Sequence, residues 1–520
     1  MTERLWEIPS SWEWTVIKEL GDVVSGATPS TKVRDYWDGD VIWFAPSDLT
    51  GYKQKFIARG AKTLTEEGLA NSSARIMPAG SVMFSSRAPV GYVAINSVPA
   101  ATNQGFKSVV PYTGIFNEYL YHYLKASKQM AEQRATGTTF KELSGAAFGV
   151  LPAPLPPTNE QRRIVEKIEA MFDEIDKGVE SLQTARATLG LYRQSLLKSA
   201  FEGRLTADWR AQNADKLETP ETLLARIQSE RDARYKDALD AWQDALSQWR
   251  ADGEEGKRPA KPRRDAEPDA PMSEQRALMD GIPPEWQWLQ IGTFGFVTKL
   301  AGFEYTKHVI YRDDGDLPVI KAENAGKSGF KVTDYSKVRS EEVAMLTRSF
   351  LNGGELLMVF VGAGTGQVAT VPTDQRYFLG PNIGMIRLET PDILPKFVEH
   401  YLRSPIGTSM KLASVKAVAQ PSLSMGTIRQ IPVAIPSPTE QAEIVRRLDA
   451  RLEAADALEA EIDAALTRAD ALRQSILKKA FSGQLVPQDP KDEPASALLD
   501  RIKAERAKAP NAKKRRSAHA

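Results

Sequence analysis

Two glycine-containing segments hold the residue types that could bind a nucleotide or a phosphate. Residues 358–366 read MVFVGAGTG, an apolar run followed by alternating glycines, which is the spacing of a nucleotide-binding opening. A helix should follow and receive the ligand at its N-terminus, but the next residues, QVATV, favour another strand. No acidic residue follows a strand about 20 residues further on. We therefore expect a glycine turn within a β-hairpin.

The other candidates for chemistry fail on spacing. Residues 325–328 read AGKS and end like a phosphate-binding loop, but Lys321 stands where that loop requires a glycine. The four histidines, His122, His308, His400 and His519, have no metal-ligand spacing. No paired carboxylates and no Ser/His/Asp set can be assigned. The sequence therefore predicts no catalytic residue and no metal site.

The elements that must position any site include one segment that occurs twice. Residues 160–205 recur as residues 440–485 at a constant offset of 280, without a gap. Glu160-Gln161 matches Glu440-Gln441, and Ala200-Phe201 matches Ala480-Phe481. A repeat of this length predicts a pseudo-twofold molecule, which we expect to meet a target that is itself approximately twofold.

Each copy of the repeat is typical of a long helix. Proline-rich stretches at residues 151–157 and 431–438 precede the copies, Thr158 and Thr439 are candidate N-caps, and Gly203 and Gly483 are candidate C-caps. Apolar residues recur with heptad-like spacing. The expected core positions are Ile164, Ile168, Met171, Ile175, Leu182, Leu189, Tyr192 and Leu196 in the first copy, and Ile444, Leu448, Leu458, Ile462, Leu472 and Ile476 in the second.

Two helices of equal length and matching pattern would bury their apolar stripes best against each other, and a pseudo-twofold axis favours an antiparallel coiled coil. At 1.5 Å per residue, about 42 residues would give a rod of roughly 63 Å. The alternative is that each helix packs only on its own globular neighbour.

Fainter repeats lie outside the helices. Ile8-Pro9 with Trp12 and Trp14 recurs as Ile282-Pro283 with Trp286 and Trp288, and LLARIQSER at 223–231 recurs as LLDRIKAER at 498–506. Two globules thus share their edges but little interior sequence. Short runs of β-branched and aromatic residues predict strands in both, with helices clearest at 117–133 and 396–403. We expect a mixed α/β (α+β) fold for each globule.

The predicted organisation is a sequence of six segments. The boundaries are 1–157 for the first globule, 158–205 for the first long helix, 206–280 for a charged helical insert and flexible linker, 281–437 for the second globule, 438–486 for the second long helix, and 487–520 for a short helix and basic tail. Within the insert, residues 252–271 are expected to be the flexible part.

Bulk properties narrow the class of protein. The chain has no cysteine, which excludes disulfides and cysteine nucleophiles. Its apolar runs are too short for a membrane span, and the first ten residues are not typical of a signal peptide. We therefore expect a cytoplasmic protein. A net charge of +1 permits a nucleic-acid partner without indicating one.

The repeated segment, PLPPxxEQxxIVxKI followed by a heptad helix ending QSxLKxAFxGxL, resembles the conserved region of type I restriction–modification specificity subunits. The first globule strengthens the likeness, because SGATPS at 25–30, DYWDG at 35–39 and IWF at 42–44 resemble the opening of that family's target recognition domains. The second globule departs from this opening and has AGFE at 301–304. The likeness covers about residues 8–205 and 282–485.

This resemblance implies a non-catalytic DNA-binding protein. Two target recognition domains would each bind one half of a split site in double-stranded DNA, and the antiparallel helices would set their spacing. Two methyltransferase subunits would dock on the helices and methylate adenine N6, and endonuclease subunits would join for restriction. The cofactors, adenosylmethionine and ATP with Mg²⁺, would bind the partner subunits and not this chain.

Under this resemblance, residues with suitable chemistry in predicted loops become candidates for DNA contact. They are Arg87, Asn103, Gln104, Lys107, Gly137, Thr138, Thr139 and Lys141 in the first globule, and Asn382, Lys411, Lys416, Gln420 and Ser422 in the second, where Asn382 is expected to correspond to Asn103. Glu160, Gln161, Glu440 and Gln441 are the candidates for partner binding.

Two other classes of function remain open on the residues alone. A stand-alone or fused DNA-modifying enzyme would need the catalytic motifs that the sequence lacks. A coiled-coil scaffold without a DNA role would show no strong salt dependence of binding, whereas each neutralised phosphate should add about −0.9 to the log–log salt slope.

Overall fold

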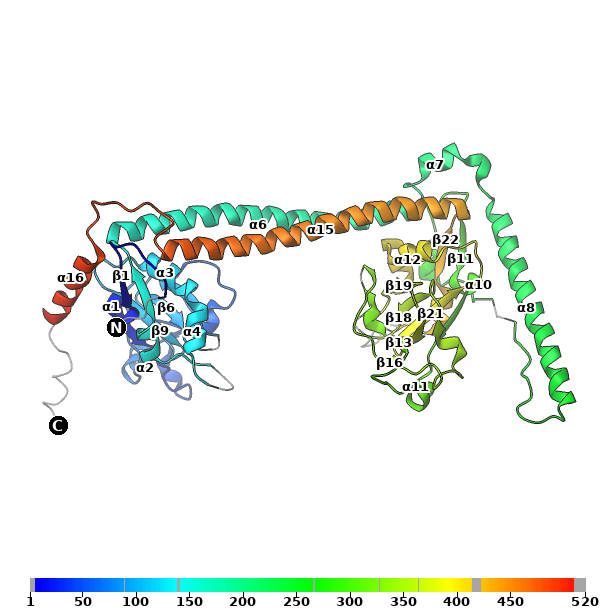
Figure 1. Cartoon of the computed structure of the whole chain (residues 1–520), viewed down its shortest axis with the longest axis horizontal. Helices are drawn as coiled ribbons and strands as arrows, with labels where there is room; N and C mark the ends of the chain where they lie inside the picture. The colour runs from blue at the N-terminus through cyan, green and yellow to red at the C-terminus, as the bar shows by residue number, and fades with distance from the viewer. Residues whose placement is uncertain are drawn as a thin grey trace. The chain divides into compact units, whose positions relative to one another are not determined.

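The computed structural model describes residues 5–87, 89–137, 141–264, 267–326, 328–362, 364–413 and 422–508. The chain divides into two compact units, Met1–Thr184 with Ile462–Ala520, and Ala185–Glu461. Each unit holds one globule, the beginning of one long helix and the end of the other (Figure 1). Each long helix therefore contributes to both units, so the units do not coincide with the six consecutive segments expected from the sequence.

The two repeated segments form the long helices α6 (Thr158–Phe201) and α15 (Pro438–Phe481). Both end before a glycine in the left-handed region, Gly203 at φ +73° and Gly483 at φ +74°, as the sequence predicts. In the first unit, Ile164 near the start of α6 and Ile476 near the end of α15 belong to one hydrophobic core. In the second unit, Leu196 near the end of α6 and Leu448 near the start of α15 likewise share one core. The predicted antiparallel pairing is thus confirmed within each unit.

Ion pairs related by the 280-residue repeat join the two long helices. In the second unit, Arg193 on α6 contacts Asp456 and Glu459 on α15, at 2.6 Å in each case. In the first unit, the matching Arg473 on α15 contacts Asp176 on α6. Both arginines are about one-fifth to one-quarter exposed, whereas Asp456 and Asp176 are each 65% exposed, so solvent weakens the pairs. They fix the register of the helices more than they stabilise them.

Three of the predicted core positions on these helices are wrong. Tyr192 is 44% exposed, Leu458 is 47% exposed, and Leu472 is 48% exposed. Tyr192 and Leu472 occupy equivalent places in the repeat, one residue before the paired arginines. The arginine side chain takes the place toward the opposite helix, and the preceding apolar residue therefore turns outward.

A buried glutamate at the start of α6 ties the helix to the first globule. The indole Nε1 of Trp12 donates to Glu160 Oε2 at 2.9 Å, and Gln488 Nε2 donates to Glu160 Oε1 at 2.5 Å. The next residue, Gln161, accepts a hydrogen bond from the main-chain N–H of Phe116 at 2.7 Å. Burial raises the pKa of Glu160, while the hydrogen bonds from Trp12 and Gln488 oppose that shift.

The same arrangement holds the start of α15 in the second unit. Trp286 Nε1 donates to Glu440 Oε2 at 3.1 Å, and the N–H of Leu394 donates to Gln441 Oε1 at 2.9 Å. Here a cation completes the site, because Arg210 Nη2 donates to Glu440 Oε1 at 2.7 Å. Arg210 precedes the second globule on α7 (Ala207–Gln212). We call these two sites the Glu–Trp brackets.

The glycine after each long helix completes the bracket at the other helix's end. A Cβ on Gly483 would lie 2.3 Å from Pro9 Cγ, and a Cβ on Gly203 would lie 2.2 Å from Pro283 Cγ. Only glycine permits this approach and the left-handed backbone together. The repeated Ile-Pro and Trp of each globule thus contact the start of that globule's own helix and the end of the other helix.

The first globule is built on three sheets. Its largest sheet has the order β2-β9-β6-β7-β4, a second has β5-β3-β8 with a parallel β3–β8 pair, and a third pairs β1 with β10. The strands are β1 (Glu13–Val16), β2 (Gly21–Ser25), β3 (Trp37–Phe44), β4 (Phe56–Ile57), β5 (Lys62–Leu64), β6 (Val82–Ser85), β7 (Val93–Asn96), β8 (Ala101–Thr102), β9 (Phe106–Pro111) and β10 (Pro152–Leu155).

The second globule repeats this topology with a different sequence. Its sheets have the orders β12-β21-β18-β19, β16-β13-β20-β17, β14-β15 and β11-β22. The pairs β12–β21–β18–β19 correspond to β2–β9–β6–β7, and the parallel β13–β20 pair corresponds to β3–β8. The strands are β11 (Gln287–Gln290), β12 (Gly295–Lys299), β13 (Leu317–Ile320), β14 (Ala325–Gly326), β15 (Gly329–Phe330), β16 (Lys337–Val338), β17 (Phe350–Leu351), β18 (Leu356–Val359), β19 (Val368–Thr370), β20 (Tyr377–Leu379), β21 (Ile383–Leu388) and β22 (Pro432–Ile435).

An aromatic helix in each globule packs on the end of the opposite long helix. In the first unit, Tyr119 and Tyr123 on α3 (Asn117–Ala126) contact the Phe481 ring edge to face. In the second, Phe397 and Tyr401 on α12 (Pro395–Arg403) contact Phe201. The helix expected at 117–133 is in fact two helices, because α3 ends at Ala126 and α4 (Lys128–Arg134) follows.

The helices that follow the long helices occupy equivalent places. Leu498 and Ile502 of α16 (Ala495–Lys508) are buried in the core of the first unit, and Leu223 and Ile227 of α8 (Pro220–Ala251) are buried in that of the second. The remaining described helices are short. They are α1 (Ile17–Leu20), α2 (Glu66–Ala70), α5 (Gly145–Gly149), α9 (Ser273–Arg276), α10 (Ile291–Phe294), α11 (Gly302–His308), α13 (Pro405–Ala413) and α14 (Met425–Gln430).

The described part of the expected flexible linker makes specific contacts. Trp242 on α8 donates its indole N–H to the carbonyl of Pro259 at 3.1 Å, and Lys261 lies over the Trp242 ring. Further on, Gln290 Nε2 donates to the carbonyl of Asp269 at 2.7 Å. These contacts tie parts of 252–264 to α8 and of 267–271 to the second globule. The flexibility of the segment stays a prediction.

In the described part of the chain, no helix combines the length and the apolar character that crossing a membrane would need.

The Glu–Trp brackets predict unequal costs for one substitution made at both sites. Glu440→Gln leaves the Arg210 side chain, which is 13% exposed, without its carboxylate, and should cost about 3–5 kcal/mol. Glu160→Gln keeps an acceptor for Trp12, and Gln488 can turn its amide oxygen toward the new NH2 group. The change also removes a charge that burial disfavours, so the cost should stay within about 1 kcal/mol. Hydrogen exchange at each bracket would measure both variants. Equal losses would contradict this account of the electrostatics.

Candidate nucleic-acid interface

Three loops of the first globule meet where β6 ends and β9 begins. The loop after β6 joins the loop before β9, because the N–H of Ser86 donates to the carbonyl of Gly105 at 2.7 Å. The third loop, before α5, joins them through the N–H of Leu143, which donates to the carbonyl of Ser86 at 2.9 Å. We call this place the three-loop junction.

The second globule builds the same junction from equivalent residues. The N–H of Phe360, after β18, donates to the carbonyl of Asn382 at 3.4 Å, and the N–H of Leu423 donates to the carbonyl of Phe360 at 2.9 Å. An isolated bridge joins Val361 to Ser422, as another joins Arg87 to Glu142 in the first globule. The junction is therefore a duplicated feature, although few of its side chains are the same.

Candidate residues of the first globule gather at this junction. Arg87, whose side chain is 36% exposed, lies 3.3 Å from Glu142. Lys107 is buried, and its Nζ donates to the carbonyl of Gln104 at 3.0 Å and lies 4.0 Å from Glu142. Burial lowers the pKa of Lys107, partly offset by Glu142. Two cations thus share one carboxylate at the base of the loops.

The other described candidates of this globule differ in how accessible they are for contact with DNA. Gln104 and Lys141 are exposed, and Gly137 is exposed with φ +120°. Asn103 is half-buried, and its Oδ1 accepts the N–H of Gly105 at 2.8 Å, so this side chain shapes its own loop. Thr138 and Thr139 lie outside the described residues.

In the second globule, the structure corrects one expected correspondence. Asn103 and Gly380 each donate their N–H to the last residue of a central strand at 2.8 Å, so Gly380 is the counterpart of Asn103. Asn382 is instead the counterpart of Gly105. It is exposed and has φ +65°, a left-handed conformation that asparagine tolerates better than most residues. Ser422 is exposed, and Lys416 and Gln420 lie outside the described residues.

Lys411 on α13 is the buried candidate of the second globule. It is 6% exposed, and its Nζ donates to the carbonyl of Gly366 at 2.5 Å. Burial, reinforced by the nearby charge of Arg403, lowers the pKa of Lys411 to about 8. Gly366 ends the turn between β18 and β19, two strands that pair antiparallel. The MVFVGAGTG segment is therefore a hairpin, as expected.

One segment at the first junction was not among the predicted site residues. The hydroxyl of Thr28 donates to Gln104 Oε1, and the N–H of Ala27 donates to the carbonyl of Thr102 at 2.8 Å. A Cβ on Gly26 would lie 1.9 Å from the carbonyl oxygen of Asn103, so only glycine allows this approach. The glycine and the hydroxyl residues of SGATPS were the available signal, but their partner loop was not visible in the sequence.

The four residues predicted to bind partner subunits are buried inside the units. Glu160, Gln161, Glu440 and Gln441 are at most 1% exposed. The two glutamates form the Glu–Trp brackets, and each glutamine bonds main-chain groups of its own globule. Their side chains offer no free surface for a direct contact. Their role in the structure is to hold the starts of the long helices in position on the globules.

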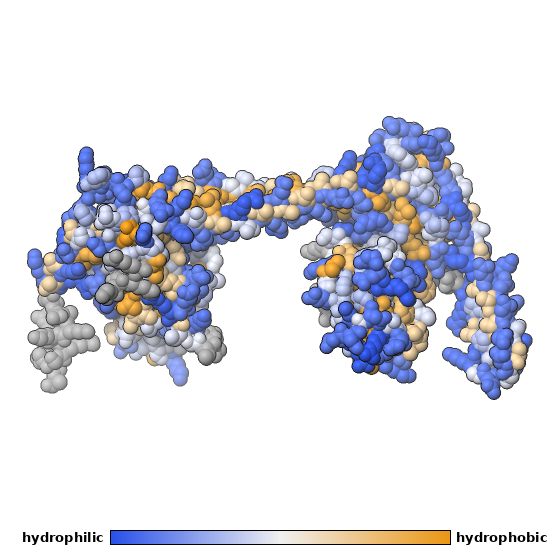
Figure 2. Space-filling view, viewed as in Figure 1, coloured by the Kyte–Doolittle hydropathy of each residue, from blue (hydrophilic) through white to orange (hydrophobic). Residues whose placement is uncertain are grey.

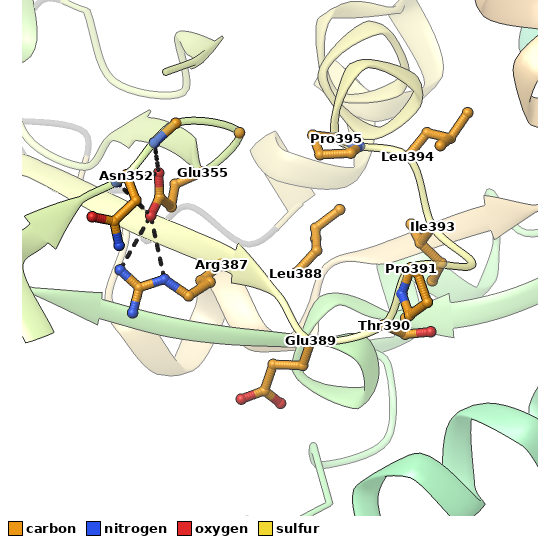
Figure 3. A pocket seen from close by; sticks show the side chains of 12 residues that line it. Asn352, Glu355, Arg387, Leu388, Glu389, Thr390, Pro391, Ile393, Leu394 and Pro395 are labelled. Carbon is orange, nitrogen blue, oxygen red and sulfur yellow. Dashed lines mark hydrogen bonds and ion pairs between the residues drawn. The ribbon is translucent and has the colours of Figure 1, made fainter. Parts of the chain in front are cut away.

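A pocket in the second globule is lined by few reactive groups. Strand-end residues and the segment before α12 line it (Figure 3). The carboxylate of Glu355 accepts the N–H of Asn352 at 3.0 Å and pairs with Arg387 at 3.2 Å. The remaining labelled wall is largely apolar, with Leu388, Ile393 and Leu394. Its polar groups therefore serve the local fold. Among the described residues, no cluster of His, Cys, Asp or Glu could hold a metal ion.

The duplicated organisation matches a known family along most of the chain. Residues 9–182 and 283–468 match the family described as the type I restriction modification DNA specificity domain. The chain belongs to this family. The two matched regions each include one globule and much of one long helix. The two target recognition domains joined by long helices, expected from the sequence, are thereby confirmed.

Curated relatives carry the same description. The specificity subunit of the type I restriction enzyme EcoBI from Escherichia coli is 25% identical over 421 residues, which is 79% of this chain and 76% of that subunit. The MjaIX specificity subunit from Methanocaldococcus jannaschii is 41% identical over 172 residues. That second alignment spans 32% of this chain and 39% of the relative.

Solved structures support the fold. A structure titled for complex assembly and conformational transition of the type I R-M system has a TM-score of 0.61 and 16% identity, and covers 92% of this chain and 100% of its own. The HsdS subunit from Thermoanaerobacter tengcongensis has a TM-score of 0.50 and 16% identity, covering 93% and 100% respectively. At such identities the likeness concerns the fold alone.

Proposed function

We propose that the chain directs a type I restriction–modification complex to a bipartite site in double-stranded DNA. Each globule reads one half of the site through its three-loop junction. The observation that carries this proposal is that one junction geometry occurs twice, with equivalent main-chain bonds and different side chains. Two junctions with the same main-chain geometry and different side chains suit two domains that bind two different half-sites.

The exposed side chains at the junctions have suitable chemistry for this task. Gln104 can bond the edge of an adenine with its amide, and Arg87 can bond a guanine or a phosphate once Glu142 releases it. Lys141 suits a phosphate contact, which gives affinity without sequence information. In the second globule, Asn382 offers an amide and Ser422 a hydroxyl. These assignments are supported by position and residue type.

The outer faces of the long helices are the proposed docking surface for two methyltransferase subunits. Leu191 is 72% exposed, and Tyr192 and Leu458 in the same unit are exposed by 44% and 47%. In the other unit, Leu472, the counterpart of Tyr192, is 48% exposed. Figure 2 shows hydrophobic residues on the surface of these helices among hydrophilic ones. Exposed apolar side chains grouped on one surface, one of them at a position that is apolar in both copies of the repeat, are typical of a protein interface.

In this proposal the chain itself performs no bond-making step. The methyltransferase subunits bind adenosylmethionine and methylate adenine N6, and endonuclease subunits with ATP and Mg²⁺ act in restriction, all in the cytoplasm. The chain's contribution is to select the site, to set the distance between its halves through the paired helices, and to hold the partner subunits. The absence of cysteine from the sequence fits a cytoplasmic location.

Mapping of N6-methyladenine tests the proposed function. Genomic DNA is compared between cells with the gene, cells without it, and cells in which the gene is restored. One bipartite motif should lose methylation on deletion and regain it on restoration. If every methylated motif survives deletion while the methyltransferase partner is still produced, the proposed role in specificity is wrong.

A surface substitution tests the docking surface. Leu191→Asp places a charge on the outer face of α6 and should weaken binding of the methyltransferase subunit about tenfold or more, because a docked aspartate loses its water. Val332→Asp is the matched control, since Val332 is 74% exposed in the same unit but lies off the long helices. Mass photometry of mixtures would give both affinities. Equal affinities for the two variants would place docking elsewhere.

A further inference from the structure

Beside the second three-loop junction lies a buried lysine, Lys411, whose charge is not paired with any carboxylate in the part of the chain that the structure describes. The Lys411 side chain rises from the last turn of α13 toward the β18–β19 turn, where Nζ bonds the carbonyl of Gly366 at 2.5 Å. At the first junction the buried lysine is Lys107 of β9, which bonds a different loop: its Nζ donates to the carbonyl of Gln104 at 3.0 Å and lies 4.0 Å from the carboxylate of Glu142. The two globules thus bury one lysine each at the junction but compensate its charge differently.

The charged groups on the described elements packed against α13 do not neutralise Lys411. On α12, Arg403 repels it. The Glu399 carboxylate on α12 is already held by Lys396 at 3.1 Å and Arg403 at 3.2 Å. On α9, Glu274 accepts the Ser273 hydroxyl at 2.9 Å. Within the described residues, the hydrogen-bond acceptor of the Lys411 ammonium group is the carbonyl oxygen of Gly366.

Burying a charge in this way costs stability. An ion taken out of water loses several kcal/mol of solvation, and a single carbonyl dipole restores only part of it. A methionine or leucine at this position would pack on α12 and α9 without that cost. A cation kept at such a site is therefore useful where an anion arrives from outside, because attraction in a low-dielectric setting acts strongly over a few ångströms.

We propose that Lys411 is the counter-charge for one DNA phosphate at the half-site read by the second globule. The inference rests on the proposed function and assigns one residue of that reading surface. Lys411 bonds the turn that Phe360 opens, because Gly366 donates its N–H to the carbonyl of Val359 at 2.8 Å. A DNA backbone that crosses the junction at Phe360 would bring a phosphate toward this ammonium group. Lys107 is less suited to this role, because the Glu142 carboxylate 4.0 Å away offsets part of its charge.

The assignment links DNA affinity to pH. The free protein holds Lys411 with a pKa of about 8, and a nearby phosphate raises that value in the complex. Binding therefore takes up a proton above about pH 8 and leaves protonation unchanged below about pH 7. Affinity should stay level up to neutral pH and then fall toward tenfold per pH unit as Lys411 loses its proton in the free protein.

The experiment measures fluorescence anisotropy of the full chain with a labelled duplex that contains the bipartite motif found by methylation mapping. The wild-type chain should lose affinity between pH 7.5 and 9.5 in the manner just described. Lys411→Met should abolish this fall and reduce the magnitude of the log–log salt slope by about 0.9. Lys411→Arg keeps its charge at every pH tested and should bind at pH 7 like the wild type, without the fall. Lys107→Met, the matched control, should keep the fall.

A flat wild-type profile, or a Lys411→Met variant that keeps both the fall and the salt slope, would overturn the assignment. Folding is checked in each variant by thermal unfolding. Lys411→Met removes a buried charge, so its unfolding midpoint at pH 7 should not drop. A duplex with a scrambled motif distinguishes failure of the proposed function from failure of the role of Lys411. If motif and scrambled duplexes bind equally, the proposed function fails; if they differ but the pH profile is flat, only the role of Lys411 fails.

Discussion

The structure depends on a hydrogen bond between a buried glutamate at the start of each long helix and a tryptophan at the start of each globule. Glu160 with Trp12 and Glu440 with Trp286 fix the point where a globule joins its helix. The glutamates can be buried because indole N–H groups, Gln488 or Arg210 bond their oxygens. The proline before each tryptophan contacts the glycine that ends the other helix, which brings both helices to the same globule. One short motif in each globule therefore organises both helix ends.

This constraint explains why the ends of the repeat are similar and the globule interiors are not. A change at a bracket disturbs a buried polar group and two helices, whereas a change in a junction loop alters a surface. The β6–β9 and β18–β21 pairs keep the same register around each junction. Exposed positions such as Gln104 and Asn382 differ between the globules without loss of the scaffold.

The long helices were predictable from the sequence because their signals are local. Proline before the start, glycine after the end and a regular apolar spacing all lie within one segment. The expected N-caps were wrong, because Thr158 and Thr439 lie inside the helices and the Thr158 hydroxyl donates to the carbonyl of Gly114 at 3.0 Å. The inward and outward faces were harder to predict. Tyr192 and Leu472 fit the heptad count, but Arg193 and Arg473 face the opposite helix, and that choice depends on aspartates hundreds of residues away. The contact of Pro259 with Trp242 on α8 could not be predicted for the same reason.

The candidate site was predictable in composition and less so in arrangement. Residue type suggested Arg87, Gln104 and Lys107 together, and the structure brings them to one junction. Burial of Lys107 and Lys411 could not be seen, because it depends on parts of the chain that are distant in sequence, such as Glu142 beside Lys107 and Gly366 beside Lys411. The correspondence between Asn382 and Gly105 likewise follows from strand register and not from sequence spacing.

The most direct measurement of the central claim, two independent readers on one scaffold, is a domain exchange. Residues 1–157 are replaced by the matching segment of another family member with a different methylation motif, and N6-methyladenine is mapped in cells that carry the chimera. The account predicts that one half of the bipartite motif changes, while the other half and the gap between them stay the same. A change in both halves, or in the gap, would contradict it.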